Sequence, residues 1–119
     1  MYRVPPDLDL SPVIGKHTTQ IGVGQFDLQI TFGPVHFAVQ SPIRIFRGKE
    51  LIAQWQEGKW PDPGFYDIMN VEVLQCEIPN DRQIVLHFEN GLEMLLEDSL
   101  DQYESMQIFI AGRPGQWII

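Results

Sequence analysis

The segment from Gln83 to Glu97 alternates apolar and polar residues on both sides of an Asn-Gly pair. A period of two is typical of a β-strand with one buried face. Asn90 and Gly91 both tolerate the positive φ angle that a tight turn between strands requires. The segment therefore predicts a β-hairpin, and its apolar positions are predicted to lie in the core: Ile84, Leu86, Phe88, Leu92, Met94 and Leu96.

A second hairpin with the same pattern is predicted upstream, with its turn at Gly33-Pro34. Its predicted core positions are Leu28, Ile30, Phe32, Val35, Phe37 and Val39. The offset between the two hairpins is 56 residues before the turn, from Leu28 to Ile84, and 57 after it, from Val35 to Leu92. This regularity predicts two copies of one β-rich unit, at about residues 8–60 and 63–119.

The remaining segments complete the predicted fold. Further strands are expected at 17–23, 43–46, 51–56, 71–78, 106–110 and 117–119, and Asp62-Pro63 predicts one short helix over 63–70. We therefore expect a single domain, 1–119, of the mainly β class: a β-sandwich or partly open barrel of two repeated antiparallel units.

Aromatic side chains divide into two groups by position. Those within the predicted strands are expected in the core: Phe26, Phe32, Phe37, Phe46, Phe88 and Phe109. Trp60 lies in the proline-rich segment 58–64, where it either covers the core or forms an exposed contact.

Charge is distributed unevenly along the chain, which has 119 residues and a net charge of −8. Residues 1–60 hold six bases and five acids, whereas residues 61–119 hold eleven acids and only Arg82 and Arg113 as bases. Such a chain should be repelled by phosphate backbones, so nucleic acid is not an expected partner. The acids are either ordinary solubility charge or a face for a basic partner.

Composition also bounds the compartment. No apolar run approaches the ~20 residues of a membrane span, and the amino-terminal residues lack the pattern of a signal peptide. Cys76 is the only cysteine, which fits a reducing cytoplasm. We expect a cytoplasmic protein without a membrane partner.

No catalytic, metal-binding or cofactor-binding residues are predicted. The three histidines, His17, His36 and His87, fall in three different predicted strands without ligand spacing. No nucleophile motif surrounds a serine or Cys76. The sequence therefore favours a protein that is not an enzyme.

If the acids form a binding face, the predicted contact residues are those near the second hairpin. They are Glu89, Glu93, Glu97, Asp98, Asp101 and Glu104.

The second hairpin also carries a family resemblance. The run Phe88-x-Asn90-Gly91 with Glu97-Asp98-Ser99, followed by Tyr103-Glu104-Ser105, resembles small bacterial β-rich proteins with a Phe-x-Asn-Gly turn and an acid-Ser … Tyr-Glu-Ser tail. Ile14-Gly15 leading to Ile21-Gly22-Val23-Gly24 resembles their first half, although Gly33-Pro34 departs from the Asn-Gly turn. Those proteins look like immunity proteins of polymorphic or contact-dependent growth-inhibition toxins.

The resemblance implies a protein that neutralises a cognate toxin by covering a basic surface. Two alternatives stay open from the residues alone. One is a non-enzymatic adaptor or self-assembling β domain, including a homodimer through an exposed strand edge. The other is a small ligand-binding barrel or hydrolase that uses the acids.

Overall fold

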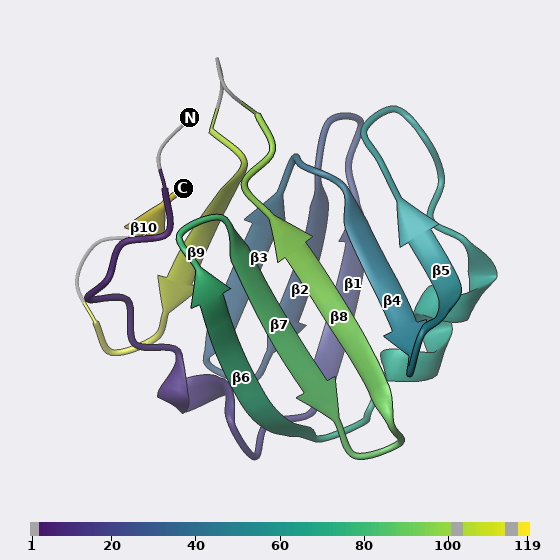
Figure 1. Ribbon diagram of the computed structural model, residues 1–119, viewed down its shortest axis with the longest axis horizontal. Helices are drawn as coiled ribbons and strands as arrows, with labels where there is room; N and C mark the ends of the chain where they lie inside the picture. The colour runs from purple at the N-terminus through teal and green to yellow at the C-terminus, as the bar shows by residue number, and fades with distance from the viewer. Residues whose placement is uncertain (1–2, 101–103, 114–116) are drawn as a thin grey trace.

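The computed structural model describes residues 3–100, 104–113 and 117–119, and in these residues two five-stranded antiparallel sheets pack face to face (Figure 1). The first sheet contains, in spatial order, β1 (Thr18–Val23), β2 (Leu28–Phe32), β3 (Val35–Val39), β9 (Met106–Ile110) and β10 (Trp117–Ile118). The second contains β5 (Glu50–Trp55), β4 (Ile43–Arg47), β8 (Leu92–Glu97), β7 (Gln83–Phe88) and β6 (Val73–Asn80). The predicted mainly β class is confirmed, in a sandwich-like form.

Both predicted hairpins form, and each turns at a glycine. Gly33 has a φ of 56° and Gly91 a φ of 87°, in the left-handed region that costs glycine little. Asn90, in contrast to the prediction, does not adopt positive φ. Its side chain holds the turn instead: Oδ1 accepts a hydrogen bond from the Leu92 N–H at 3.2 Å, and Nδ2 donates to the Asp67 carbonyl at 3.0 Å.

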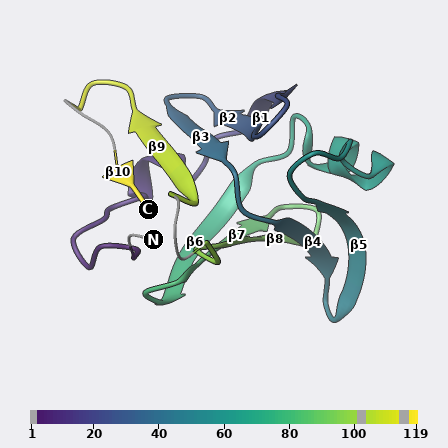
Figure 2. The same cartoon turned by 90° about the horizontal axis from the view of Figure 1, so that it is seen from above.

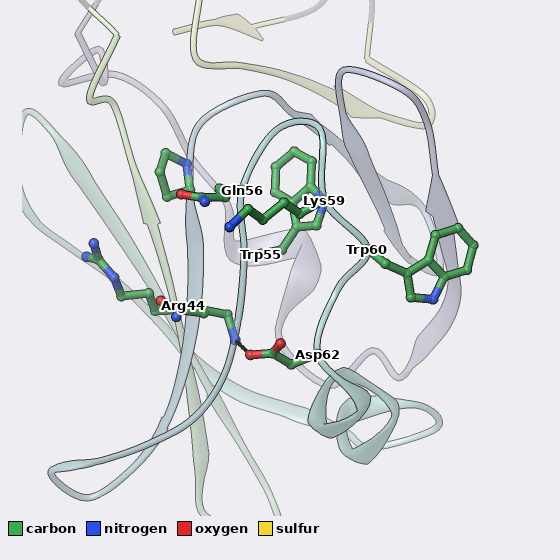
Figure 3. Close-up of a pocket in the computed structure, with 8 residues that line it drawn as sticks. Arg44, Trp55, Gln56, Lys59, Trp60 and Asp62 are labelled. Atoms are coloured by element: carbon green, nitrogen blue, oxygen red, sulfur yellow. Dashed lines mark hydrogen bonds between the residues drawn. The ribbon is translucent and has the colours of Figure 1, made fainter.

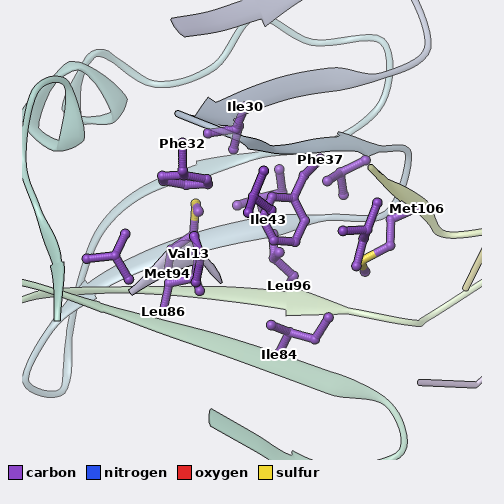
Figure 4. Close-up of a cluster of buried hydrophobic side chains, with 14 of the residues drawn as sticks. Val13, Ile30, Phe32, Phe37, Ile43, Ile84, Leu86, Met94, Leu96 and Met106 are labelled. Carbon is purple, nitrogen blue, oxygen red and sulfur yellow. The ribbon is translucent and has the colours of Figure 1, made fainter. Parts of the chain in front are cut away.

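The core lies between the two sheets (Figure 4). All twelve apolar positions predicted from the hairpins are at most 3% exposed. Phe32 packs edge-on against Phe37 within the first sheet, with ring centroids 5.7 Å apart, and reaches Phe88 of the second sheet at 6.2 Å. Burial of an aromatic side chain of this size contributes roughly 1.5–3 kcal/mol.

Three of the expected core aromatics lie outside the core instead. Phe46 is half-buried and takes an outward position on β4, next to the buried Ile45. Phe26 is 59% exposed because the turn between β1 and β2 contains it, so the strand alternation does not extend that far. Phe109 lies on β9 but takes the outward position between the buried Ile108 and Ile110.

Strands of the two halves are exchanged between the sheets. In sequence β4 and β5 follow β3, yet β4 pairs with β8; likewise β9 follows β8 and pairs with β3. The two pairings match in register, because Ile45 lies opposite Met94 and Ile108 lies opposite Phe37. Each sheet therefore combines strands of both predicted units.

The short helix predicted over 63–70 is a 3-10 helix, η2 (Pro63–Ile68), which packs on β5. Phe65 and Ile68 are buried, but Asp62 does not cap the helix with its side chain. Its carboxylate accepts the backbone N–H of Gln54 at 3.0 Å, so it protects the edge of β5. Another 3-10 segment, the one-turn η1 (Ser11–Val13), was not predicted. Within the described residues, neither helical segment is long and apolar enough to cross a membrane.

Candidate functional site

Three of the predicted contact residues share the outer face of the second sheet. Glu93 and Glu97 leave β8 on the side opposite to the buried Met94 and Leu96. Glu89 follows β7 in the turn and is exposed. The strands β6, β7 and β8 contain no lysine or arginine. We call the outer side of these three strands, with the adjoining Glu89, the acidic face.

A histidine lies between two carboxylates of the acidic face. His87 on β7 pairs in register with Glu93 on β8, and its Nδ1 lies 3.6 Å from a Glu93 oxygen. On its other side, Nε2 lies 3.2 Å from a carboxylate oxygen of Glu77 on β6. The alternation of residues 83–88 places His87 on the outward side of its strand, but no local pattern identifies Glu77 as its neighbour. The pairing of β6 with β7 produces that contact.

Apolar side chains interrupt the carboxylates on the same outer surface. Leu95 and Val85 are half-buried and lie opposite each other on β8 and β7. Phe46 on β4 lies opposite Glu93 and is also half-buried. An apolar centre with a charged margin is the composition of many protein interfaces. The sequence already indicates these apolar outward residues, because Val85 and Leu95 fall on the polar side of the alternation in their strands.

Glu97 already has a cationic partner. The Arg44 guanidinium donates to its carboxylate at 2.7 Å, from β4 across to β8. Both side chains are partly exposed, so the pair contributes about 0–1 kcal/mol. This contact neutralises one end of the acidic face.

Asp98 does not lie at the surface, contrary to its predicted role as a contact residue. It is 1% exposed and accepts hydrogen bonds from the Ser105 hydroxyl at 2.6 Å and from the Arg3 guanidinium at 3.1 Å. Burial alone would raise the pKa of Asp98, but the Ser105 hydroxyl and the Arg3 guanidinium favour the carboxylate and hold its pKa below the ordinary value. Asp98 therefore ties the amino-terminal segment to the loop before β9.

Glu104, another predicted contact residue, does not extend the acidic face. Glu104 precedes β9 of the first sheet and accepts a hydrogen bond from Gln107 at 2.7 Å. Asp101 lies outside the described residues. The structure thus brings together Glu89, Glu93 and Glu97, and adds Glu77 and His87 to them.

Trp60 lines three surface hollows. No pattern in the sequence predicts these hollows. One hollow of about 190 Å³ lies beside β4 and β5, and its lining includes Arg44, Lys59 and Asp62. In Figure 3 the Trp60 ring points away from Arg44 and Lys59. The other two hollows lie on the β1 side of Trp60, with volumes of about 380 and 730 Å³. Pro61 and Pro63, which closely follow Trp60 in sequence, were the signal for this exposed segment.

The nucleophiles and metal-ligating residues of the described chain are dispersed. No group of three or more histidine, cysteine, aspartate or glutamate residues in the described ranges is placed to hold a metal ion. Burial, with a smaller effect of Glu77, raises the pKa of the half-buried Cys76 thiol to about 11. A thiol of this kind is a weak nucleophile near neutral pH.

No protein-family model, curated protein or solved structure matches the chain.

Proposed function

We propose that this chain is a non-enzymatic binding protein of the immunity type, which covers a basic surface of a cognate toxin in the cytoplasm with its acidic face. The observation that carries the proposal is the composition of that face. Glu77 on β6, Glu93 on β8 and Glu89 in the turn after β7 present carboxylates, and the three strands contain no lysine or arginine.

The geometry suits a rigid binding surface. The acidic face belongs to the interior strands β7 and β8 and to β6, all fixed by the core behind them. Val85 and Leu95 supply apolar area that a partner can cover, and the carboxylates surround it. Exposed carboxylates at the margin of an interface mainly accelerate association with a basic partner, because they steer the diffusional encounter.

The first test is biological. The chain is co-expressed with the toxic carboxy-terminal domain of the protein encoded beside its gene, and cell survival is measured. We expect survival with the chain and death without it. Death in both cultures would overturn the proposal of immunity.

The second test measures the acidic face directly by binding kinetics with the same domain at two salt concentrations. Glu89→Lys combined with Glu93→Lys should lower the association rate about tenfold at the lower salt and less at the higher. The matched control, Asp7→Lys combined with Glu50→Lys, changes the net charge equally at exposed positions elsewhere. Equal effects of both double variants would show that only net charge matters and would contradict a localised acidic face.

A further inference from the structure

The free edge of β1 borders an apolar groove. Two hollows together run along β1 and the turn that follows it, from Thr19 to Phe26, and Trp60 lines both. The opposite wall is the segment 57–69, which includes η2. Figure 2 shows the outer side of β1 facing this segment. We call this surface the β1 groove.

Most of the β1 edge has no strand beside it. Backbone hydrogen bonds cover its first residue, because Thr18 donates to Val71 at 3.2 Å and accepts from Asn70 at 2.8 Å. In the described ranges, no segment pairs with Gln20–Val23 on the side away from β2. The Gly24 N–H donates to the Asp27 carbonyl within the hairpin, so by the alternation of an antiparallel pair the backbone groups of Ile21 and Val23 point outward.

This edge lacks two of the features with which proteins prevent strand addition, since residues 18–25 contain no charged residue and no proline. The irregularity in the pairing of β1 with β2 lies between Thr18 and Gln20, before the uncovered residues Gln20–Val23. The other long edges of the described sheets are each contacted at one residue as well: Asp62 bonds to Gln54 on β5, and Val73 of β6 exchanges hydrogen bonds with Gly15 and Lys16. These two strands, unlike β1, contain charged residues or proline: Glu50 in β5, and Glu77 and Pro79 in β6. The edge of β1 is therefore the one best suited to another strand.

Three aromatic side chains at the groove are largely exposed to solvent. Trp60 is 80% exposed, Tyr66 77% and Phe26 59%. Aromatic side chains of this kind form the side-chain contacts of a strand that binds in extended conformation, while the main chain supplies hydrogen bonds.

Charge identifies the class of segment that fits. The floor of the groove is uncharged, and acids outnumber bases among the residues that line it or adjoin its aromatic side chains: Asp27, Glu57, Asp62 and Asp67 against Lys59. A second copy of this chain would bring a further charge of −8 and be repelled. An apolar extended segment flanked by lysine or arginine is complementary to the groove instead.

We propose that the β1 groove binds an extended peptide segment of a partner protein, which adds to the first sheet beside β1, places apolar side chains against Trp60 and Tyr66, and carries flanking basic residues. This binding site goes beyond the acidic face, because none of the residues that line the groove lies on β6, β7 or β8. The proposals for the two surfaces can therefore be tested, and contradicted, independently of each other.

The test uses a phage-displayed library of random peptides, panned on the whole chain, followed by fluorescence anisotropy with the enriched peptide. We expect enriched sequences with alternating apolar residues and flanking bases. N-methylation of alternate backbone nitrogens is made in both registers of that peptide. One register should abolish binding, because only every second N–H of a strand added to β1 faces that strand. Enrichment of acidic sequences, no enrichment, or indifference to N-methylation would each overturn the proposal.

Matched variants localise the binding. Val23→Pro removes an outward N–H, which an edge strand tolerates, and should weaken binding at least about tenfold, whereas Val23→Ala keeps the N–H and should bind nearly as the parent. Trp60→Ala should also lose at least about tenfold, while Phe109→Ala removes an exposed aromatic on β9 and should not. Circular dichroism verifies that each variant is folded. A concentration-dependent dimer of the parent chain that Val23→Pro dissociates would assign the edge to self-association and overturn the peptide proposal.

Discussion

At the scale of single residues, Asp98 is a buried carboxylate that joins two segments of the chain. Its carboxylate is inaccessible to solvent and connects Arg3 with Ser105, two residues far apart in sequence. A buried carboxylate is stable only when hydrogen-bond donors satisfy it, because transfer of a charge from water is costly. The three residues therefore fasten the amino-terminal segment to the start of β9.

Asp98→Asn tests this contact and its dependence on pH. We expect a loss of about 1.5–3 kcal/mol of unfolding free energy at pH 7, because the charge-assisted hydrogen bonds are weakened. The pKa of Asp98 is lower in the folded protein than the ordinary value of about 3.9. The stabilisation is therefore complete above about pH 4 and is lost as the pH falls through the folded-state pKa.

The measurement is urea unfolding of both proteins over a pH series. The two stabilities should converge at the acidic end. The control is Glu89→Gln at an exposed position, which should change stability by no more than about 0.5 kcal/mol. Equal stabilities of Asp98→Asn and the parent at pH 7 would contradict the structural role.

The sequence did contain the signal for the burial of Asp98. Its position continues the alternation of Leu92, Met94 and Leu96, all of which point inward. The expectation of exposure followed from charge alone, and charge does not identify a partner. Arg3 is 95 residues from Asp98 in sequence, so its contact with Asp98 could not be predicted from local patterns.

At the scale of elements, the close approach of η2 to β5 depends on Gly64. A Cβ atom at this position would lie 3.0 Å from Cβ of Ala53 and 3.2 Å from both Cγ2 and the carbonyl oxygen of Ile52. The last of these is backbone and cannot rotate away. The glycine therefore sets the distance between the two elements.

We expect Gly64→Ala to destabilise the protein by about 1–3 kcal/mol, the usual range for overpacking. Thermal unfolding monitored by circular dichroism measures the effect. Gly22→Ala on β1 is the matched control, since its added Cβ would meet nothing closer than 3.8 Å and its φ is not positive. A melting temperature of Gly64→Ala at or above that of Gly22→Ala would show that η2 can shift without cost.

Elements whose determinants are local were predictable from the sequence. Both hairpins were found because alternation and turn chemistry lie within a few residues of each other, as at Asn90-Gly91. The strand β6 continues through Pro79 and Asn80, two residues beyond the expected end of the strand at residue 78. Proline is tolerated there because β6 is an edge strand, a property that only the assembled sheet defines.

At the scale of the whole molecule, the exchange of strands joins the two halves of the chain. The pair β4–β5 joins its sheet only by the pairing of β4 with β8. In the same way, the pair β9–β10 joins its sheet only by the pairing of β9 with β3. Neither pairing is visible in a local pattern, so the alternation that predicts the hairpins could not predict how β4 and β9 pair. The buried residues at the two junctions match: Ile45 lies opposite Met94 where β4 pairs with β8, and Ile108 lies opposite Phe37 where β9 pairs with β3.

The exchange predicts that the two halves fold only together. A chain divided between Trp60 and Pro61 leaves β4 without β8 in one fragment and β9 without β3 in the other, so each fragment exposes one apolar face of its strands to water. We expect each isolated fragment to lack a cooperative thermal transition by circular dichroism and the equimolar mixture to regain the strand signal of the intact chain. As a control, the intact chain carrying Trp60→Ala should fold, because Trp60 is exposed and outside the core. If either fragment alone unfolds cooperatively as a monomer, its strands form a complete sheet by themselves, and the junctions of β4 with β8 and β9 with β3 are not required for folding.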